Sequence, residues 1–286
     1  MSALQQLRTM TTIVADTGDL AAIERLKPID ATTNPSLITK ALIHPDNQSM
    51  LAETMSRQQG DVDAVIDALT IQIGCSILEL IEGRVSTEVD ARLSYDTQAT
   101  IDKALEYIEA YQKAGVDSDR VLIKMAATWQ GIEAARYLET QNIHCNLTLL
   151  FGQHQAIACA DAGVTLISPF VGRILDWQKR QQNRQNVPVA DDMGVQSVKL
   201  IYQYYKQHGY QTQVMGASFR SVEQILALAG CDLLTIAPNL IDELANMDVE
   251  VTRQLSPTMS TDLDAMSKVS LTHEEFSAAY QNDKVT

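Results

Sequence analysis

Eight short apolar segments alternate with longer amphipathic ones along the 286 residues, and this alternation limits the possible folds more than any other feature. The short segments predict strands at 12–15, 31–33, 85–89, 121–125, 146–150, 165–168, 213–217 and 234–236. Segments typical of helices lie at 47–57, 61–81, 97–114, 129–141, 153–162, 194–207, 221–229 and 238–247. Strands that alternate with helices favour a parallel sheet with the helices packed outside it.

A single barrel is the architecture that this alternation favours. An open doubly wound sheet is the alternative, but it would need a glycine-rich phosphate loop, and the sequence contains neither GxGxxG nor GxxxxGK[ST]. We therefore expect one (β/α)8 TIM barrel domain over residues 1–286. The tail at 251–286 is polar and turn-rich, with one short helix predicted at 272–280.

The charge balance excludes several kinds of partner. A net charge of −14 argues against nucleic acid and against anionic membranes, so a phosphorylated ligand would need a local group of arginines. The N-terminus has no basic flank followed by an apolar segment, and nowhere are there ~18 consecutive apolar residues. The four cysteines form no CxxC pair or zinc-like spacing and indicate buried thiols in a reducing compartment. Together these features predict a cytoplasmic protein.

One charge interrupts the predicted strand at 121–125, and it belongs to Lys124. A lysine in a strand buried on both faces must find a counter-charge or lose its proton, because desolvation disfavours the ammonium form. A neutral buried amine attacks carbonyl groups to form a Schiff base. The segment alone leaves a second reading open, in which Lys124 lies at the strand end and extends its ammonium group into solvent.

Polar side chains gather where the predicted strands end. In a barrel of parallel strands the carboxyl ends meet on one face, and enzymes of this fold place their chemistry there. In chain order the residues concerned are Asp16, Thr32, Asn34, Glu88, Lys124, Asn146, Thr148, Ser168, Phe170, Arg173, Ser218 and Arg220, of which Phe170 alone is apolar. Each alone could be a helix cap or a turn residue, but packing does not readily explain their joint occurrence at corresponding points of successive strands. We therefore expect them to form one site.

The charged members of this set predict proton transfer and anion binding. Asp16 and Glu88 come from different strands and offer two carboxylates, one to move protons and one to activate water. Arg173 and Arg220 are bidentate anion binders on neighbouring loops and together predict a phosphate site. A structural alternative stays open for each arginine: a salt bridge to Asp176 for Arg173, and packing at a helix N-terminus for Arg220.

Neutral polar groups complete the expected site. Asn34 and Asn146 offer donors and acceptors for sugar hydroxyls without adding charge. Ser168 and Ser218 lie close by in the sequence and add hydroxyl contacts. The set therefore suits a polyhydroxylated ligand that carries a phosphate.

Two further charges follow Glu88 along the chain. Asp90 and Arg92 continue at a spacing of two residues, so all three side chains are expected on one face of the strand. We expect Asp90 and Arg92 to form a supporting ion pair that orients Glu88. The five histidines are scattered, form no nucleophile or metal cluster with a neighbour, and are assigned no role.

Five segments resemble the signatures of the transaldolases. They are Asp-Ala-Thr-Thr-Asn-Pro-Ser at 30–36, Ser-Thr-Glu-Val-Asp-Ala-Arg at 86–92, Ile-Lys-Met-Ala-Ala-Thr-Trp at 123–129, Ile-Ser-Pro-Phe-Val-Gly-Arg at 167–173 and Met-Gly-Ala-Ser-Phe-Arg at 215–220. The resemblance runs in order from residue 7 to residue 255 without large gaps. It implies a barrel of the class I aldolase type that acts in the pentose phosphate pathway, without metals or organic cofactors.

The resemblance also implies a role for each residue of the site. Lys124 would form the Schiff base with the ketose donor, sedoheptulose 7-phosphate or fructose 6-phosphate. Asp16 would act on the hydroxyl whose deprotonation breaks the carbon–carbon bond, and Glu88, with Thr148 placing a water, would serve imine formation and hydrolysis. The substrate contacts implied are Asn34, Asn146 and Ser168 at the dihydroxyacetone part, Arg173, Ser218 and Arg220 at the phosphate, and Thr32 and Phe170 beside them. The acceptor would be glyceraldehyde 3-phosphate or erythrose 4-phosphate.

Two alternatives to a transaldolase stay open. Relatives that cleave fructose 6-phosphate and release dihydroxyacetone tend to carry Gln where Glu88 stands and Tyr near Phe170, whereas this chain has the transaldolase residues at both positions. The other alternative is a phosphosugar-binding barrel with impaired turnover. Transaldolases of this type usually continue further, with a long final helix that helps to exclude water, and the tail at 251–286 is expected to lack it. The oligomeric state is left open, with a homodimer as one assembly to test.

Overall fold

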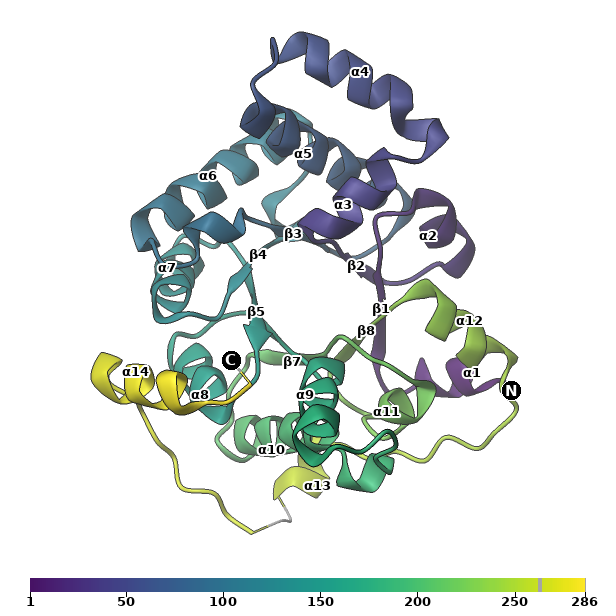
Figure 1. The fold of residues 1–286 in the computed structure, drawn as a ribbon, viewed down its shortest axis with the longest axis vertical. Coiled ribbons are helices and arrows are strands. Elements are labelled where there is room, and N and C mark those ends of the chain that lie inside the picture. The colour runs from purple at the N-terminus through teal and green to yellow at the C-terminus, as the bar shows by residue number, and fades with distance from the viewer. Residues whose placement is uncertain (262–263, 286) are drawn as a thin grey trace.

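Eight parallel strands form a closed barrel in the computed structural model, which describes residues 1–261 and 264–285 (Figure 1). The strands are β1 (Thr12–Asp16), β2 (Asp30–Thr32), β3 (Val85–Glu88), β4 (Val121–Ala126), β5 (Cys145–Leu150), β6 (Leu166–Pro169), β7 (Gln213–Gly216) and β8 (Leu233–Ile236). Each strand pairs with its neighbours in chain order, and β8 closes the ring against β1. The predicted (β/α)8 barrel and its eight strands are confirmed, with strand ends that differ by one residue.

Helices follow most of the strands and form the outer ring. They are α1 (Ala3–Leu7), α2 (Leu20–Leu26), α3 (Pro35–Leu42), α4 (Gln48–Arg57), α5 (Val62–Leu80), α6 (Thr97–Lys113), α7 (Trp129–Thr140), α8 (Gln153–Asp161), α9 (Gly172–Gln182), α10 (Met193–Gln207), α11 (Val222–Leu226), α12 (Pro238–Asn246), α13 (Pro257–Thr261) and α14 (His273–Asn282). Helix α1 precedes β1, and α12, α13 and α14 follow β8. The predicted helices are confirmed, although α11 is shorter than expected. Helices α1, α2, α3, α9 and α13 are not among the predicted ranges, because α9 is rich in polar residues and the other four are short.

Large apolar side chains fill the amino-terminal half of the barrel interior. They form a buried cluster of their own, which consists of Val14, Leu122, Leu166, Met215 and Leu233. Val14 stands two residues before Asp16, and Leu122 stands two residues before Lys124. Residues two apart on a strand point to the same face, so the apolar cluster forms the floor on which the polar strand ends rest.

A buried tyrosine ties the outer helices to β3. Tyr111 on α6 is fully buried, and its hydroxyl lies 2.6 Å from the Thr87 hydroxyl, one residue before Glu88. Burial raises the pKa of Tyr111, so the phenol keeps its proton at neutral pH. Gly74 on α5 gives the ring room, because a Cβ at that position would lie 1.8 Å from the tyrosine oxygen. The packing of α5 against α6 therefore holds β3, and with it Glu88, in place.

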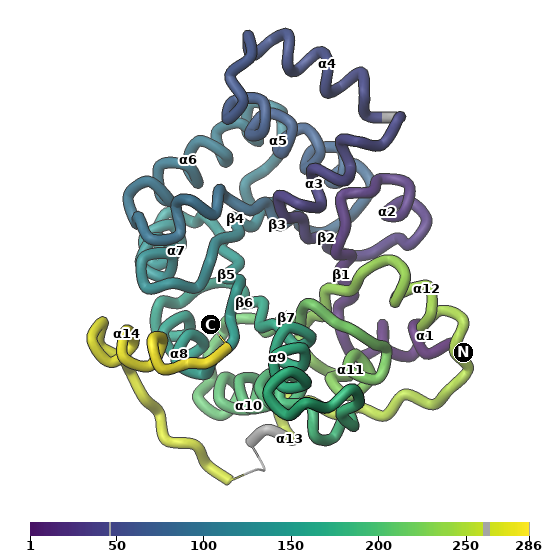
Figure 2. The backbone as a smooth tube through the Cα atoms, viewed as in Figure 1, coloured from purple at the N-terminus to yellow at the C-terminus, as the bar shows by residue number. Residues whose placement is uncertain are grey.

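The C-terminal segment ends in α14, which lies beside α8 and packs on both α7 and α8 (Figure 2). Phe276 is the buried residue of this helix, and its ring contacts those of Trp129, His154 and Tyr280. The helix predicted at 272–280 is therefore confirmed. Because α7 and α8 follow β4 and β5, the tail packs against the helices that begin next to the predicted site.

Truncation of Phe276 to alanine is expected to loosen α14 from the barrel. The loss of a buried phenylalanine ring costs ~3 kcal/mol. Amide hydrogen exchange in α14, followed by mass spectrometry, should therefore become about 100-fold faster while β4 and β5 keep their protection. Gln281→Ala removes an exposed side chain of the same helix and serves as the control. Unchanged exchange in Phe276→Ala would show that other contacts hold the helix.

Candidate active site

Lys124 lies at the centre of the polar strand ends. Its Nζ is 3.0 Å from Oε2 of Glu88 and donates a hydrogen bond to the main-chain oxygen of Thr33 at 3.0 Å. The strand register explains this pair, because Glu88 on β3, Lys124 on β4 and Asn146 on β5 are direct neighbours. Only 9% of the lysine side chain is exposed. The solvent-facing reading of Lys124 is therefore wrong, and its counter-charge is Glu88.

A cavity of about 260 Å³ opens between the strand ends. Its lining includes Asp16, Thr32, Asn34, Lys124, Thr148, Ser168, Phe170, Arg173, Ser218 and Arg220. The other two predicted residues are joined to this lining by direct contacts, Glu88 through Lys124 and Asn146 through Ser168. The structure thus brings the predicted residues together around a space that suits a small metabolite.

Two threonines orient Asp16. The Thr32 hydroxyl donates to Oδ1 of Asp16 at 3.0 Å and lies 2.7 Å from the Thr235 hydroxyl on β8. A hydroxyl has a single proton, so Thr235 is the donor in the second bond. Thr32, predicted to contact substrate, therefore also holds the carboxylate. Thr235 lies outside the predicted site, because β8 otherwise consists of apolar residues and offered no charged residue at its end.

Asn146 is fully buried, and both ends of its amide are engaged. Its Nδ2 donates to Oγ of Ser86 at 3.0 Å, and its Oδ1 accepts from Oγ of Ser168 at 2.6 Å. These two serines set the orientation of the amide. Ser86 has no role in the prediction, although its spacing of two residues from Glu88 places it on the same inward face.

Asn34 and Thr148 differ in what their side chains already bind. Asn34 is the N-cap of α3, where its Oδ1 accepts from the main-chain nitrogen of Leu37 at 3.0 Å and from the Ser36 hydroxyl at 2.7 Å. The hydroxyl of Thr148 is buried and has no hydrogen-bond partner among residues 1–261 and 264–285. A buried hydroxyl of this kind in the wall of a cavity indicates a position that water or substrate fills.

The two arginines follow adjacent strands. Arg173 lies in the first turn of α9, and its guanidinium group stands over the ring of Phe170, 5.1 Å from the centroid. Arg220 follows β7 and pairs with Asp176 on α9 at 2.8 Å. The sequence allows a salt bridge between Asp176 and Arg173, but the structure pairs Asp176 with Arg220. Both arginines line the same cavity.

A glycine allows the two arginine loops to touch. The main-chain nitrogen of Gly172 donates to the Ser218 oxygen at 2.7 Å, and a Cβ at Gly172 would lie 2.2 Å from that oxygen. Ser218 has a φ of 62°, in the left-handed region that non-glycine residues rarely adopt. The buried side chain of Gln224 accepts from the main-chain nitrogen of Arg220 at 2.7 Å. These contacts hold Arg173 and Arg220 next to each other.

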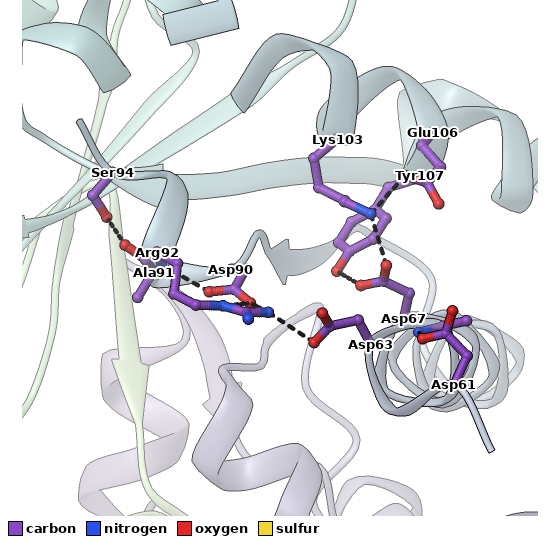
Figure 3. A network of polar contacts seen from close by, with 11 residues as sticks. Asp61, Asp63, Asp67, Asp90, Ala91, Arg92, Ser94, Lys103, Glu106 and Tyr107 are labelled. Carbon is purple, nitrogen blue, oxygen red and sulfur yellow. Dashed lines mark hydrogen bonds and ion pairs between the residues drawn. The ribbon is translucent and has the colours of Figure 1, made fainter. Parts of the chain in front are cut away.

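The ion pair between Asp90 and Arg92 forms as predicted but has a different role. Among the described residues, the further partner of Arg92 is Asp63 on α5, at 2.8 Å, rather than Glu88 (Figure 3). The Arg92 guanidinium group lowers the pKa of Asp90. With 69% of its side chain exposed, Arg92 joins the loop after β3 to α5 at the surface. The predicted orientation of Glu88 by this pair is therefore wrong, and Lys124 is its partner.

The barrel and its lysine-centred cavity define a (β/α)8 enzyme of the class I aldolase type. The chain matches the model of the transaldolase/fructose-6-phosphate aldolase family over residues 13–286 and belongs to this family. The resemblance drawn from the five sequence segments is thereby confirmed.

Curated relatives named transaldolase match nearly the whole chain. The transaldolase of Thermosynechococcus vestitus is 54% identical over 100% of this chain and 75% of its own length. That of Nostoc sp. is 53% identical over 99% of this chain and 88% of its own, and that of Methylococcus capsulatus is 56% identical over 91% and 82%. Family and relatives together support transaldolase activity, so the chain is an enzyme of the transferase class.

Removal of the Thr235 hydroxyl is expected to weaken catalysis more than stability. Thr235→Val keeps the shape of the side chain, but the Thr32 hydroxyl loses its donor and can turn away from Asp16. We expect kcat to fall about tenfold for a loss of ~1 kcal/mol in the free energy of unfolding. Steady-state kinetics and urea unfolding measure the two effects, with Thr235→Ser as the control that keeps the hydroxyl. Lower stability with an unchanged kcat would contradict the orienting role.

Proposed function

We propose that this site transfers a dihydroxyacetone unit through a Schiff base on Lys124. The donor is a ketose phosphate, sedoheptulose 7-phosphate or fructose 6-phosphate, and the acceptor is an aldose phosphate, glyceraldehyde 3-phosphate or erythrose 4-phosphate. The observation that carries the proposal is the buried pair of Lys124 and Glu88, 3.0 Å apart, beside a cavity that Asp16, Arg173 and Arg220 line.

Imine formation requires a free amine and a route for water. Glu88 accepts a proton from the Lys124 ammonium group, and the amine attacks the C2 carbonyl carbon of the donor to give a carbinolamine. Glu88 then protonates the carbinolamine hydroxyl, which leaves as water while the carbon–nitrogen double bond forms. The Thr148 hydroxyl, buried and without a partner among the described residues, is suited to hold that water.

Asp16 carries the step that breaks and remakes the carbon–carbon bond. It takes the proton of the C4 hydroxyl, the electrons of the C3–C4 bond move into the iminium group to form an enamine, and the first aldose leaves. The enamine carbon then attacks the carbonyl carbon of the acceptor, and Asp16 returns the proton to the new hydroxyl. Thr32 supports this role because it binds Oδ1 and leaves Oδ2 for the substrate. Hydrolysis of the new imine frees the product.

Neutral side chains hold the dihydroxyacetone part. Asn34, Asn146 and Ser168 are bound to neighbouring groups before any substrate enters, so their donors and acceptors are already oriented. Preorganised groups of this kind lose little entropy when they bind the substrate hydroxyls. Their lack of charge also leaves the proton transfers to Asp16 and Glu88.

The phosphate binds to Arg173 and Arg220, with the Ser218 hydroxyl next to them. Arg220 lies within 3.3 Å of that hydroxyl, and Asp176 holds its guanidinium group in place. Two adjacent guanidinium groups bind a phosphate through several charge-assisted hydrogen bonds. They also provide a local positive field in a chain whose net charge is −14.

Release of free dihydroxyacetone is the competing outcome. It requires protonation of the enamine carbon before an acceptor arrives. Glu88 and Phe170 favour transfer, because relatives that release dihydroxyacetone tend to carry Gln and Tyr near these positions. The test is an assay with fructose 6-phosphate in which the transfer product and free dihydroxyacetone are measured together, with and without erythrose 4-phosphate. A rate of dihydroxyacetone release higher than the rate of transfer to erythrose 4-phosphate would contradict the proposal.

The cellular compartment and the oligomeric state of the enzyme are part of the same proposal. We infer that it works in the cytoplasm, in line with its acidic charge and its four free cysteines, three of them buried. Within the described residues, no helix is long and apolar enough to cross a membrane. A homodimer is proposed as its assembly, and analytical ultracentrifugation of the purified chain tests this directly.

Borohydride reduction in the presence of fructose 6-phosphate is expected to trap a dihydroxyacetone-derived adduct on Lys124. Peptide mapping by mass spectrometry locates the adduct, and Lys124→Met should abolish both the adduct and turnover because the nucleophile is gone. Lys199 on α10 is the control, since burial lowers the pKa of Lys199 and makes its amine a possible target. Lys199→Met should keep the adduct. An adduct on another lysine, or none, would contradict the Schiff-base mechanism.

Arg220→Ala is expected to weaken the binding of phosphorylated substrates selectively. A hydrogen bond between charged groups contributes ~1.5–3 kcal/mol, so KM for fructose 6-phosphate should rise about 10- to 100-fold. Transfer of dihydroxyacetone to an unphosphorylated aldehyde should fall far less. Arg180→Ala, at an exposed position on α9, is the control and should leave both reactions unchanged. Equal losses for phosphorylated and unphosphorylated substrates would reject the phosphate role.

A further inference from the structure

Strand β5 is irregular at the residue that follows Thr148. Its register with β6 runs from Leu147 opposite Ile167 to Leu150 opposite Pro169, so β5 holds one extra residue there. Leu149 has a φ of 53°, in the left-handed region, where a large side chain is sterically disfavoured. Such a conformation persists only where surrounding contacts hold it, and it lies directly beside a proposed catalytic residue.

The side chain of Gln155 supplies those contacts. Its Nε2 donates to the main-chain oxygens of Leu149 at 3.0 Å and Ala127 at 2.9 Å. Its Oε1 accepts from the main-chain nitrogens of Phe151 at 2.9 Å and Gly152 at 3.2 Å. Both protons and both acceptor positions of the amide are therefore used, in a residue that is 0% exposed.

These four bonds join the strand of Thr148 to the strand of Lys124. Ala127 stands three residues after Lys124, and its main-chain nitrogen donates to the Thr148 oxygen at 2.7 Å. The Ala127 oxygen is bound to Gln155, and the same amide holds the carbonyl of the irregular residue, Leu149. Gln155 thus fixes the distance between the ends of β4 and β5 at the level of the proposed chemistry.

We propose that Gln155 is a positioning residue for imine formation and hydrolysis. It holds the irregular turn of β5 so that the Thr148 hydroxyl faces the cavity without an internal partner, free to bind the water that enters or leaves the carbinolamine. This inference rests on the water-binding role proposed above for Thr148. Gln155 touches no substrate, and it acts through the backbone on either side of Thr148.

A single-turnover experiment separates this role from general stabilisation. The rate of adduct formation on Lys124 is measured by borohydride quenching at saturating fructose 6-phosphate, together with the steady-state KM. In Gln155→Leu the rate should fall about tenfold, because a displaced catalytic group loses much of its effect, while KM stays within about twofold. Gln155→Glu keeps the two accepted bonds and loses the two donated ones. It should show the same roughly tenfold slower adduct formation as Gln155→Leu, with a smaller loss of folding stability. Rates equal to that of the parent enzyme in both variants would overturn the proposal.

Gln224 offers a matched control. It is also a buried glutamine in the first turn of its helix, and it binds the main-chain nitrogen of Arg220 at 2.7 Å and the Asp192 carboxylate at 2.7 Å. Gln224→Leu should therefore raise KM and leave the rate of adduct formation at saturation unchanged. Identical kinetic defects in Gln155→Leu and Gln224→Leu would mean that loss of a buried amide merely loosens the barrel, which contradicts the proposal.

A double-mutant cycle tests whether Gln155 acts through Thr148. Combined with Thr148→Val, Gln155→Leu should cause no further loss in the rate of adduct formation, because the group that it positions is already gone. If the fold-loss in the double variant equals the product of the fold-losses in the two single variants, the proposal is overturned. The failure of the proposed function looks different: the parent enzyme would then form no adduct on Lys124 at all.

Discussion

The contact between Lys124 and Glu88 inside the barrel is the interaction on which the rest of the site depends. With 9% and 15% of their side chains exposed, both groups have lost most of their hydration, which costs several kcal/mol for each ion unless a partner replaces the water. Removal of either partner would leave a buried charge uncompensated. Apolar residues of similar size would usually serve stability at least as well, so the pair is better explained by chemistry.

The barrel supplies this pair through strand register rather than through loops. Glu88, Lys124 and Asn146 are neighbours on three successive strands, and Leu122, two residues before Lys124, belongs to the apolar floor of the barrel. Side chains of the outer helices then hold β3 and β5 in position. Tyr111 binds the residue before Glu88, and Gln155 binds the turn after Thr148. Strand and helix packing together give the preorganised geometry that proton transfer needs.

Much of the fold and of the site could be predicted because parallel strands bring their carboxyl ends to one face. Asp16, Lys124 and Arg220 lie far apart in the chain, yet each lies in a recognisable strand or shortly after one. Spacing could not predict which neighbours those residues would bind. Asp176 on α9 pairs with Arg220 in the loop after β7. Thr235 contacts the Thr32 hydroxyl, which in turn binds Asp16. Such contacts depend on how elements pack, which local pattern does not encode.

The most direct test of a Schiff base at Lys124 is exchange of the C2 carbonyl oxygen of fructose 6-phosphate with isotopically labelled water. Imine formation expels this oxygen as water, and hydrolysis returns an oxygen from the solvent, so each cycle inserts label without any acceptor. Mass spectrometry of the recovered sugar should show exchange that depends on the enzyme and disappears in Lys124→Met. Exchange no faster than in buffer alone, with transfer activity intact, would contradict a covalent intermediate on Lys124.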